Sequence, residues 1–287
     1  MTAETYTARV AEQSRASMGL PLAYSRLVDH AVAAALPPDQ LALAACGDPD
    51  AISSIGRAIA VHEGYLIEAS IAEAAKSHSG HLILTGVKLP VLQEAVNLIV
   101  RHQPDQVCAL SVDAEGRALQ SYFPDLVIVN RAAHTGIVLD IKRSLAGYGG
   151  SGKLNELQTK MAAAALALPD VLWRDHKRSF VDRVGCAIID ASRTEDDVAG
   201  GLWGLSGLDN LLGCNGVGET AKAAVAAFRQ TVRQTWVAAM TMPTTPASAD
   251  KLTQLQAGTT EGCRHPRNEE PRPAQVTLFR PGTYPVH

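Results

Sequence analysis

Two apolar runs joined by a short polar link constrain the fold of this chain more than any other feature. The runs cover residues 126–130 and 136–141, and residues 131–135 join them. A link this short connects neighbouring antiparallel strands, because parallel neighbours need a long crossover. Side chains alternate between the two faces of a strand, so we expect Asp140 and Lys142 to point the same way.

Asp125, which immediately precedes the first run, adds a chemical meaning to this pattern. If Asp125 lies beside the end of the second strand, two carboxylates and one ammonium group converge at one position. Such a group suits metal-assisted hydrolysis of a phosphodiester, because carboxylates bind Mg²⁺ and a lysine can orient or activate the attacking water. An ordinary hairpin whose terminal charges are solvated is the alternative.

These residues resemble the motif of the PD-(D/E)XK nuclease superfamily, whose members have the restriction-endonuclease-like fold. Pro124-Asp125 corresponds to the first part of the motif, and Asp140-Ile141-Lys142 corresponds to the second part. The order of the predicted elements over residues 52–192 also resembles the α-β-β-β-α-β core of that superfamily. The resemblance implies an α/β protein with a mixed central β-sheet flanked by helices, and with extra helices at both ends of the chain.

The activity that the resemblance implies is that of a deoxyribonuclease dependent on Mg²⁺ or Mn²⁺. Asp125 and Asp140 would be catalytic residues and would hold the metal together with the main-chain carbonyl group of Ile141. Lys142 would assist the attacking water. The implied partner is DNA.

A glutamate from the first core helix often completes the site in this superfamily, and Glu68 is the candidate here. Glu68 shares a helical face with Ile71 and Ala75. A carboxylate on an apolar face is unfavourable unless it is paired or binds a metal. Glu63 is the second choice, and a solvated glutamate at the edge of the helix is the alternative for both.

One lysine and one run of basic residues are candidates for contacts with the phosphate backbone of a nucleic acid. Lys153 stands at the start of a predicted helix, where main-chain N–H groups also attract anions. The densest basic run outside the tail lies between that helix and the last predicted strand of the core, and it contains Arg174, His176, Lys177 and Arg178. Phosphate contacts of this kind position a nucleic acid without reading its sequence. Solvated surface charge is the alternative.

Residues 147–153 support a rival interpretation from another chemical class. They match G-x-x-x-x-G-K, the start of a nucleotide-binding phosphate loop. Leu154 stands where a Ser or Thr would ligate Mg²⁺, and the preceding strand ends several residues before Gly147. A third interpretation keeps the nuclease fold but gives it a non-catalytic role in DNA binding or assembly.

Helix and strand patterns divide the chain into four parts. A helical extension covers residues 1–51, the nuclease-like core 52–192, a glycine loop with an amphipathic helix 193–242, and a proline-rich, mostly disordered tail 243–287. Apart from the hairpin, the patterns predict strands at 81–85, 106–112 and 184–190, and helices at about 52–77, 90–102, 153–168 and 219–240, with Pro169 ending the third helix.

Composition narrows the class of protein. A net charge of −3 over 287 residues means that any affinity for DNA must come from a local basic surface or a metal. The five cysteines lack zinc-ligand spacing, and no apolar run approaches the ~20 residues of a membrane span. We therefore expect a cytoplasmic protein with no membrane partner. Cutting both strands of a duplex needs two sites, which is consistent with a homodimer, but no sequence feature indicates an interface.

Overall fold

The computed structural model describes residues 20–78, 80–102, 109–148, 151–176 and 179–241. The chain divides into two units, Met1–Met242 and Pro243–His287, and all of the described residues belong to the first. The predicted tail therefore lies outside the described residues, as do most of the first twenty residues of the helical extension. No described helix has the length and the apolar character that crossing a membrane requires.

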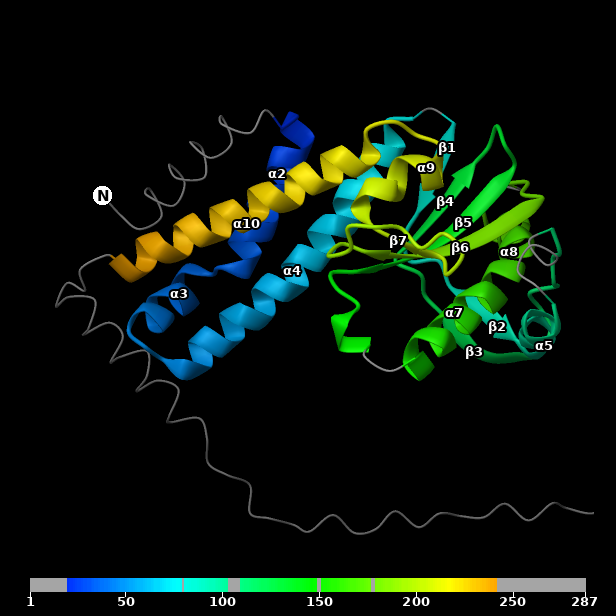
Figure 1. The fold of residues 1–287 in the computed structure, drawn as a ribbon, viewed down its shortest axis with the longest axis horizontal. Helices are drawn as coiled ribbons and strands as arrows, with labels where there is room; N and C mark the ends of the chain where they lie inside the picture. The colour runs from blue at the N-terminus through cyan, green and yellow to red at the C-terminus, as the bar shows by residue number, and fades with distance from the viewer. Residues whose placement is uncertain (1–19, 79, 103–108, 149–150, 177–178, 242–287) are drawn as a thin grey trace, which may run out of the picture. The chain divides into compact units, whose positions relative to one another are not determined.

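A five-stranded mixed sheet forms the centre of the α/β fold (Figure 1). Its spatial order is β1-β4-β5-β6-β7, with antiparallel pairs on the β1 side of β5 and parallel pairs on the β7 side. A separate two-stranded antiparallel sheet contains β2 and β3. The strand bounds are β1 His81–Leu84, β2 Leu89–Leu92, β3 Ala118–Tyr122, β4 Leu126–Asn130, β5 Thr135–Lys142, β6 Arg183–Asp190 and β7 Leu202–Trp203.

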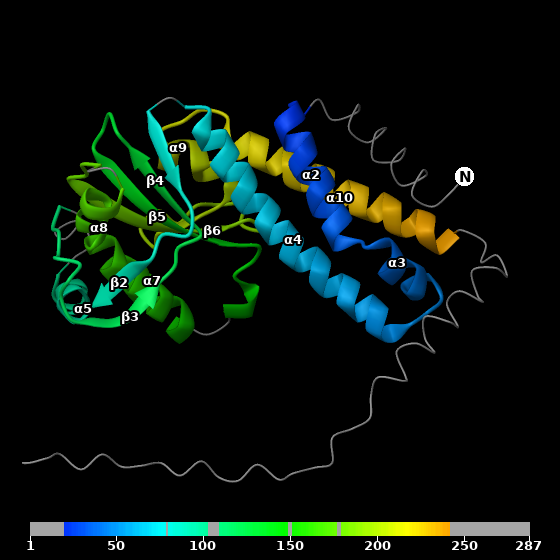
Figure 2. The ribbon, with the colours of Figure 1, turned by 180° about the vertical axis from the view of Figure 1, so that it is seen from behind.

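Helices cover both faces of the five-stranded sheet, and Figures 1 and 2 show the two sides. The long helices α4 and α10 run side by side with α2, while α7 and α8 follow β5 and return the chain to β6. The helix bounds are α2 Leu22–Ala35, α3 Pro38–Ala45, α4 Pro49–Lys76, α5 Gln93–Arg101, η1 Ala146–Tyr148, α7 Ser151–Leu166, α8 Leu168–Asp175, η2 Leu205–Gly207, α9 Leu208–Leu212 and α10 Val217–Thr241.

Strand alternation sorts the buried side chains into two cores. Leu139 and Ile141 of β5 pack in the core that α4 and α10 cover, together with the fully buried Phe228. Val138 of the same strand packs in the second core, with residues of α7, α8 and the small sheet, including the buried Met161. The sheet is therefore buried on both faces, as its continuous apolar strands require.

Most of the predicted elements are confirmed. The antiparallel hairpin of β4 and β5, the strands near 81–85 and 184–190, and the helices near 52–77 and 219–240 all form. The turn of the hairpin covers residues 131–134, since Thr135 already pairs with Asn130. The α/β class with a mixed central sheet and flanking helices is also as expected.

Three predicted elements differ from the structure. Residues 89–92 form β2, so the helix expected from Pro90 begins only at Gln93; proline is tolerated here because the two-stranded sheet has only edge strands. Residues 109–112 form no strand, and the N–H group of Val112 donates to the carbonyl of Leu166 at the end of α7 (2.9 Å). Residues 106–108 lie outside the described residues. The helix predicted over 153–168 forms as α7 and ends at Leu166, but Pro169 lies in the first turn of a further helix, α8, that follows directly.

A carboxylate from the preceding short helix accepts hydrogen bonds from the main chain at the start of α10. Asp209 of α9 accepts hydrogen bonds from the main-chain N–H groups of Gly216 (2.7 Å) and Gly218 (2.8 Å). First-turn N–H groups have no partner inside a helix, so this side chain supplies what the helix lacks. Hydrogen bonds from Gly218, Gly216 and Val217 lower the pKa of Asp209, despite the opposing effect of its desolvation.

Gly218→Ala is expected to lower the free energy of unfolding by about 1–3 kcal/mol, since overpacking moves backbone. An added Cβ would collide with the main-chain carbonyl oxygen of Leu205. Gly56→Ala in the exposed interior of α4 is the matched control, since its Cβ would meet nothing within 4 Å. That control should raise stability by about 0.5–1 kcal/mol. Denaturant unfolding measures both, and equal effects of the two changes would contradict the packing at Gly218.

Asp209→Asn is expected to destabilise the protein at neutral pH but not in strong acid. A carboxyl group whose pKa is lower in the folded state stabilises that state above its unfolded pKa of about 3.9 and loses this effect as the pH falls through the folded value. Thermal unfolding of wild type and variant across this range should therefore show a difference that shrinks on acidification. A difference independent of pH would mean that the charge of Asp209 does not cap α10.

Candidate active site

Strand register brings the carboxylates of Asp125 and Asp140 to one end of the β4–β5 hairpin. Leu126 pairs with Leu139, so the next position in each strand places Asp125 beside Asp140. The main-chain N–H of Ile141 donates to Asp125 Oδ2 over 2.5 Å. This hydrogen bond lies just beyond the last main-chain pair of β4 and β5, and it fixes the direction of the Asp125 carboxylate.

Lys142 joins the two carboxylates. Its Nζ forms an ion pair with Asp140 Oδ1 and lies 3.9 Å from Asp125 Oδ2. The Asp140 side chain is 7% exposed, whereas the side chains of Lys142 and Asp125 are 26% and 32% exposed. The group is thus buried at Asp140 and opens to solvent at the other two residues. The three residues that the sequence places together do lie together, and their catalytic and metal-binding roles stay predictions.

Tyr122 is a member of the site that sequence reasoning missed. Its O–H donates to Asp140 Oδ2 over 2.8 Å, and Tyr122 itself is buried at the end of β3. Lys160 of α7 lies with its Nζ 5.5 Å from the centre of the Tyr122 ring, on the same side of the sheet. A buried tyrosine needs a partner for its hydroxyl group, but the sequence does not say that this partner is Asp140.

Burial and charge together set the ionisation of the group. Desolvation raises the pKa of Asp125, and the charge of Asp140 adds to that, while the N–H of Ile141 and the charge of Lys142 oppose it. Burial alone would lower the pKa of Lys142, but its hydrogen bond to Asp140 and the charges of Asp140 and Asp125 raise it overall. Lys142 therefore remains a cation between two acids.

Glu68 of α4 lies near enough to Asp125 for their charges to interact. Burial raises the pKa of Glu68, and the charge of Asp125 raises it further. Two partly buried carboxyl groups that disfavour each other's charge would be stabilised by a cation. The role of Glu68 in the site stays a prediction.

The donor chemistry of these side chains suits a hard divalent cation, because carboxylate and main-chain oxygens are its preferred ligands. In the part of the chain that the structure describes, however, no three His, Cys, Asp or Glu side chains are grouped closely enough to hold a metal ion. Asp140 already has Lys142 on one oxygen and Tyr122 on the other. Asp125 and Glu68 are therefore the carboxylates best suited to accept a cation, and the ligand role of Ile141 stays a prediction.

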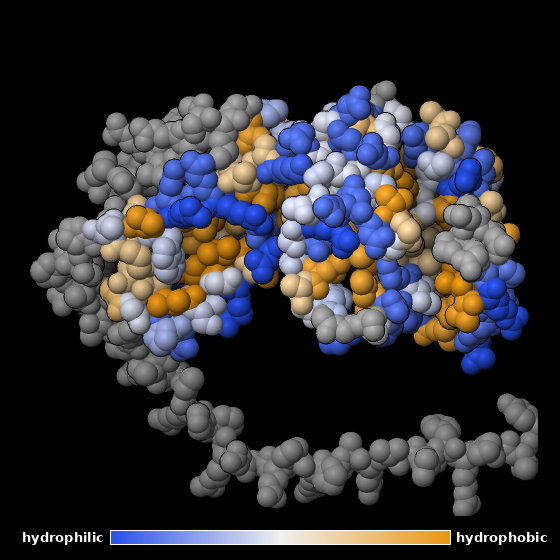
Figure 3. All heavy atoms as spheres, in the orientation of Figure 1, coloured by the Kyte–Doolittle hydropathy of each residue, from blue (hydrophilic) through white to orange (hydrophobic). Residues whose placement is uncertain are grey.

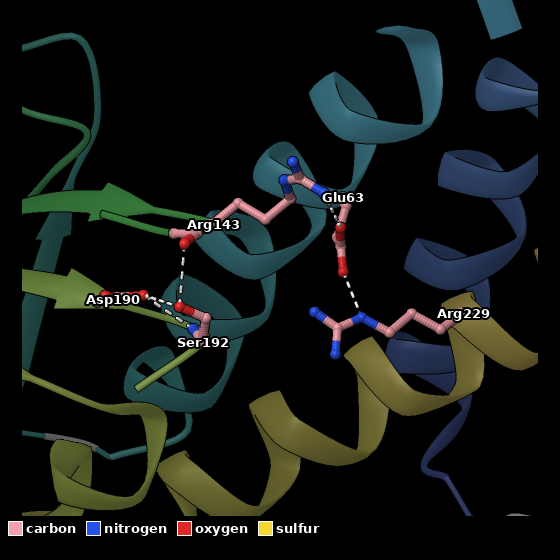
Figure 4. A network of polar contacts seen from close by, with 6 residues as sticks. Glu63, Arg143, Asp190, Ser192 and Arg229 are labelled. Atoms are coloured by element: carbon pink, nitrogen blue, oxygen red, sulfur yellow. Dashed lines mark hydrogen bonds and ion pairs between the residues drawn. The ribbon is translucent and has the colours of Figure 1, made fainter. Parts of the chain in front are cut away.

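Glu63, the second-choice glutamate, has partners of its own. It is 3% exposed, and its carboxylate accepts a hydrogen bond from Arg229 Nε over 2.5 Å and lies 3.5 Å from Arg143 Nη1. Figure 4 shows the two guanidinium groups converging on Glu63 from α10 and from the end of β5. We refer to Glu63, Arg143 and Arg229 as the Glu63 cluster.

Arg174 and His176, the described members of the basic run expected to bind phosphate, lie away from the site. Arg174 belongs to the last turn of α8 and pairs with Glu115 (2.9 Å) and Asp170 (3.6 Å). His176 directly follows α8, near the start of β6, whereas Lys142 stands at the other end of the parallel β5–β6 pair. Lys177 and Arg178 lie outside the described residues. The structure therefore does not bring Arg174 or His176 to Asp140, and their role with DNA stays a prediction.

The glycine-rich segment before α7 is described only in part. Residues 146–148 form η1, residues 149–150 lie outside the described residues, and Lys153 is exposed in the first turn of α7. Farther along this helix, the side-chain amide of Gln158 donates to the carbonyl of Gly200 (2.6 Å). The phosphate-loop interpretation stays a prediction, and the exposed Lys153 fits either that role or a nucleic-acid contact.

Comparison with models of protein families, with curated proteins and with solved structures finds no match to this chain.

Proposed function

We propose that the protein is a metal-dependent nuclease that hydrolyses phosphodiester bonds of DNA. The observation that carries this proposal is the convergence of Asp125, Asp140 and Lys142 at one end of the β4–β5 hairpin. A cation held between two acids at the end of buried strands is costly to build for stability alone, because burial penalises each charge.

The order of elements around these residues supports the same proposal. Helix α4 precedes β1, strands β4 and β5 form the hairpin, and α7 leads through α8 to β6, which is parallel to β5. This order corresponds to the α-β-β-β-α-β core of restriction-endonuclease-like nucleases, with β2, α5 and β3 inserted after the first strand. We propose that fold family on the topology and on the motif residues together.

The proposed roles follow from the contacts. Asp125 and Glu68, with Asp140 and the carbonyl of Ile141, would hold Mg²⁺ or Mn²⁺, which supplies Lewis acidity toward a phosphate. Lys142 would donate a hydrogen bond to the attacking water or to a phosphate oxygen as negative charge develops. Fixed charges of this kind stabilise a transition state without reorganising.

The remaining roles concern positioning and partners. Tyr122 holds one oxygen of Asp140 and so directs the other toward Lys142. A homodimer would place two such centres on the strands of a duplex. A phosphate-loop protein that uses residues 147–153, or a non-catalytic member of the nuclease fold, would leave the buried group around Asp140 without a role.

Asp140→Ala and Lys142→Ala are each expected to lower the rate of DNA cleavage at least ~10²-fold, which is typical when a charged group that stabilises the transition state is removed. Cleavage of plasmid and single-stranded DNA with Mg²⁺ or Mn²⁺ measures the rate. Lys76→Ala and Glu73→Ala are matched controls, since that pair is exposed on α4 (61% and 41%). Retained cleavage in both site variants would refute the assignment. An inactive wild type whose ATP binding depends on Lys153 would favour the phosphate-loop alternative.

Tyr122→Phe is expected to lower kcat about tenfold, which corresponds to about 1.4 kcal/mol, with little change in KM. The change removes the O–H that holds Asp140 Oδ2 but keeps the ring in the core. Tyr65→Phe, on an exposed tyrosine of α4 (62%), is the matched control. An unchanged kcat in the Tyr122 variant would show that the hydroxyl group serves packing and not the position of Asp140.

A further inference from the structure

The Glu63 cluster holds more positive charge than the burial of its carboxylate requires. The side chain of Glu63 is 4% exposed, and a buried carboxylate needs a cationic partner. The hydrogen bond from Arg229 Nε to Glu63 Oε1 meets that need. Arg143 adds a second guanidinium group, and both guanidinium groups are permanently charged. Two cations against one anion leave the cluster with a net positive charge.

Both arginines keep donors that Glu63 does not use. Arg229 contacts Glu63 through Nε, so its two terminal nitrogens are not used by the hydrogen bond that Figure 4 draws to the carboxylate. Arg143 contacts it through one terminal nitrogen. The side chains are 58% and 51% exposed. A guanidinium fork that is already oriented matches the geometry of a phosphate group and loses little freedom on binding it.

The cluster adjoins the candidate active site along the chain. Arg143 directly follows Lys142, so their Cα atoms are about 3.8 Å apart. Helix α4 contains both Glu63 and Glu68, and the charge of Asp125 contributes to the raised pKa of Glu68. A strand of nucleic acid has a phosphate about every 3.4 Å along the helix axis. The two side chains diverge from the end of β5, because Lys142 reaches Asp140 and Asp125 whereas Arg143 reaches Glu63 of α4. A strand of nucleic acid that runs from Lys142 toward α4 would therefore bring a neighbouring phosphate to Arg143.

Ser192 and Asp190 anchor the segment that follows Arg143. Ser192 Oγ donates to Asp190 Oδ1 over 2.7 Å and lies 3.2 Å from Ser144 Oγ, in the residue after Arg143 (Figure 4). Asp190 is buried and also accepts from the N–H groups of Ser192 (2.9 Å) and Leu145 (3.3 Å), which fixes the loop that leaves β5. Arg143 therefore extends from an anchored loop, as a positioning role demands.

We propose that Arg143 and Arg229, held by Glu63, form a phosphate-binding subsite that seats a DNA strand next to Asp140 and Lys142. This inference deepens the proposed nuclease function and rests on it for the identity of the anion. The subsite contacts backbone phosphates and not bases, so its contribution is independent of sequence. It also supplies the local positive charge that a chain with a net charge of −3 needs in order to bind DNA.

The test is binding of a short fluorescein-labelled, single-stranded oligodeoxynucleotide, measured by fluorescence anisotropy in EDTA across a salt series. Arg229→Ala and Arg143→Ala should each raise Kd about tenfold, since a hydrogen bond to a charged group contributes about 1.5 kcal/mol or more. Each variant should also make the slope of log K against log salt shallower by about 0.7. Arg101→Ala, on an exposed arginine that ends α5, is the matched control and should change neither.

Thermal unfolding of each variant separates the subsite from a purely structural cluster. A lower Tm with an unchanged Kd and salt slope in folded protein would overturn the proposal, as would a wild type without salt-dependent binding. Arg229→Lys keeps a cation beside Glu63 and should keep the fold, while still weakening binding through loss of the fork. The binding assay contains EDTA, so its result does not depend on metal-dependent cleavage. Loss of binding in the arginine variants, together with no cleavage by the wild type in the separate assay with Mg²⁺ or Mn²⁺, would support the subsite and refute only the hydrolysis.

Discussion

The pairing of Leu126 with Leu139 is the constraint on which the candidate site depends. It places Asp125 beside Asp140. Lys142 lies two residues after Asp140 on the same face of β5, where its side chain contacts both carboxylates. A slip of one residue would exchange the two faces of the strand and move every buried side chain of β5 into the wrong core. The apolar side chains on both faces therefore hold the polar group in place, although none of them touches substrate.

The position of β5 in the sheet explains the environment of that polar group. It pairs antiparallel with β4 on one side and parallel with β6 on the other, so its end has no open edge. Helices cover both of its faces. Charges at the end of such a strand are partly removed from water, where they interact more strongly than at the surface. The opposed effects on the pKa values of Asp125 and Lys142 are the result.

The hairpin could be predicted from the sequence because its two strands and the link between them are adjacent in the chain. Alternating side chains and a short link determine how residues 126–142 fold, and so the grouping of Asp125, Asp140 and Lys142 could be predicted. The partners supplied by other parts of the chain could not. Glu63 and Arg229 are 166 positions apart, and no periodicity links them. Tyr122 was missed for the same reason, since its contact with Asp140 depends on the path of β3.

Pro90 and Pro169 show a different limit of sequence reasoning. Proline is acceptable in the first turn of a helix and also in an edge strand, so its presence does not say which of these forms. Pairing with β3 decides the first case in favour of a strand, and the packing of α8 residues against the second core decides the other in favour of a new helix. Both outcomes depend on segments that are distant in the sequence.

The small sheet of β2 and β3 is formed by a segment inserted in the sequence between two strands that pair with each other. Strands β1 and β4 are neighbours in the central sheet, although β2, α5 and β3 separate them in the sequence. This insertion ends at Tyr122, whose hydroxyl group binds Asp140. A relative that exchanged the insertion for another one would keep the central sheet and its three charged residues. It would nevertheless lose the hydrogen bond that the hydroxyl group of Tyr122 donates to Asp140, so a change of insertion alters the surroundings of Asp140 while the central sheet stays the same.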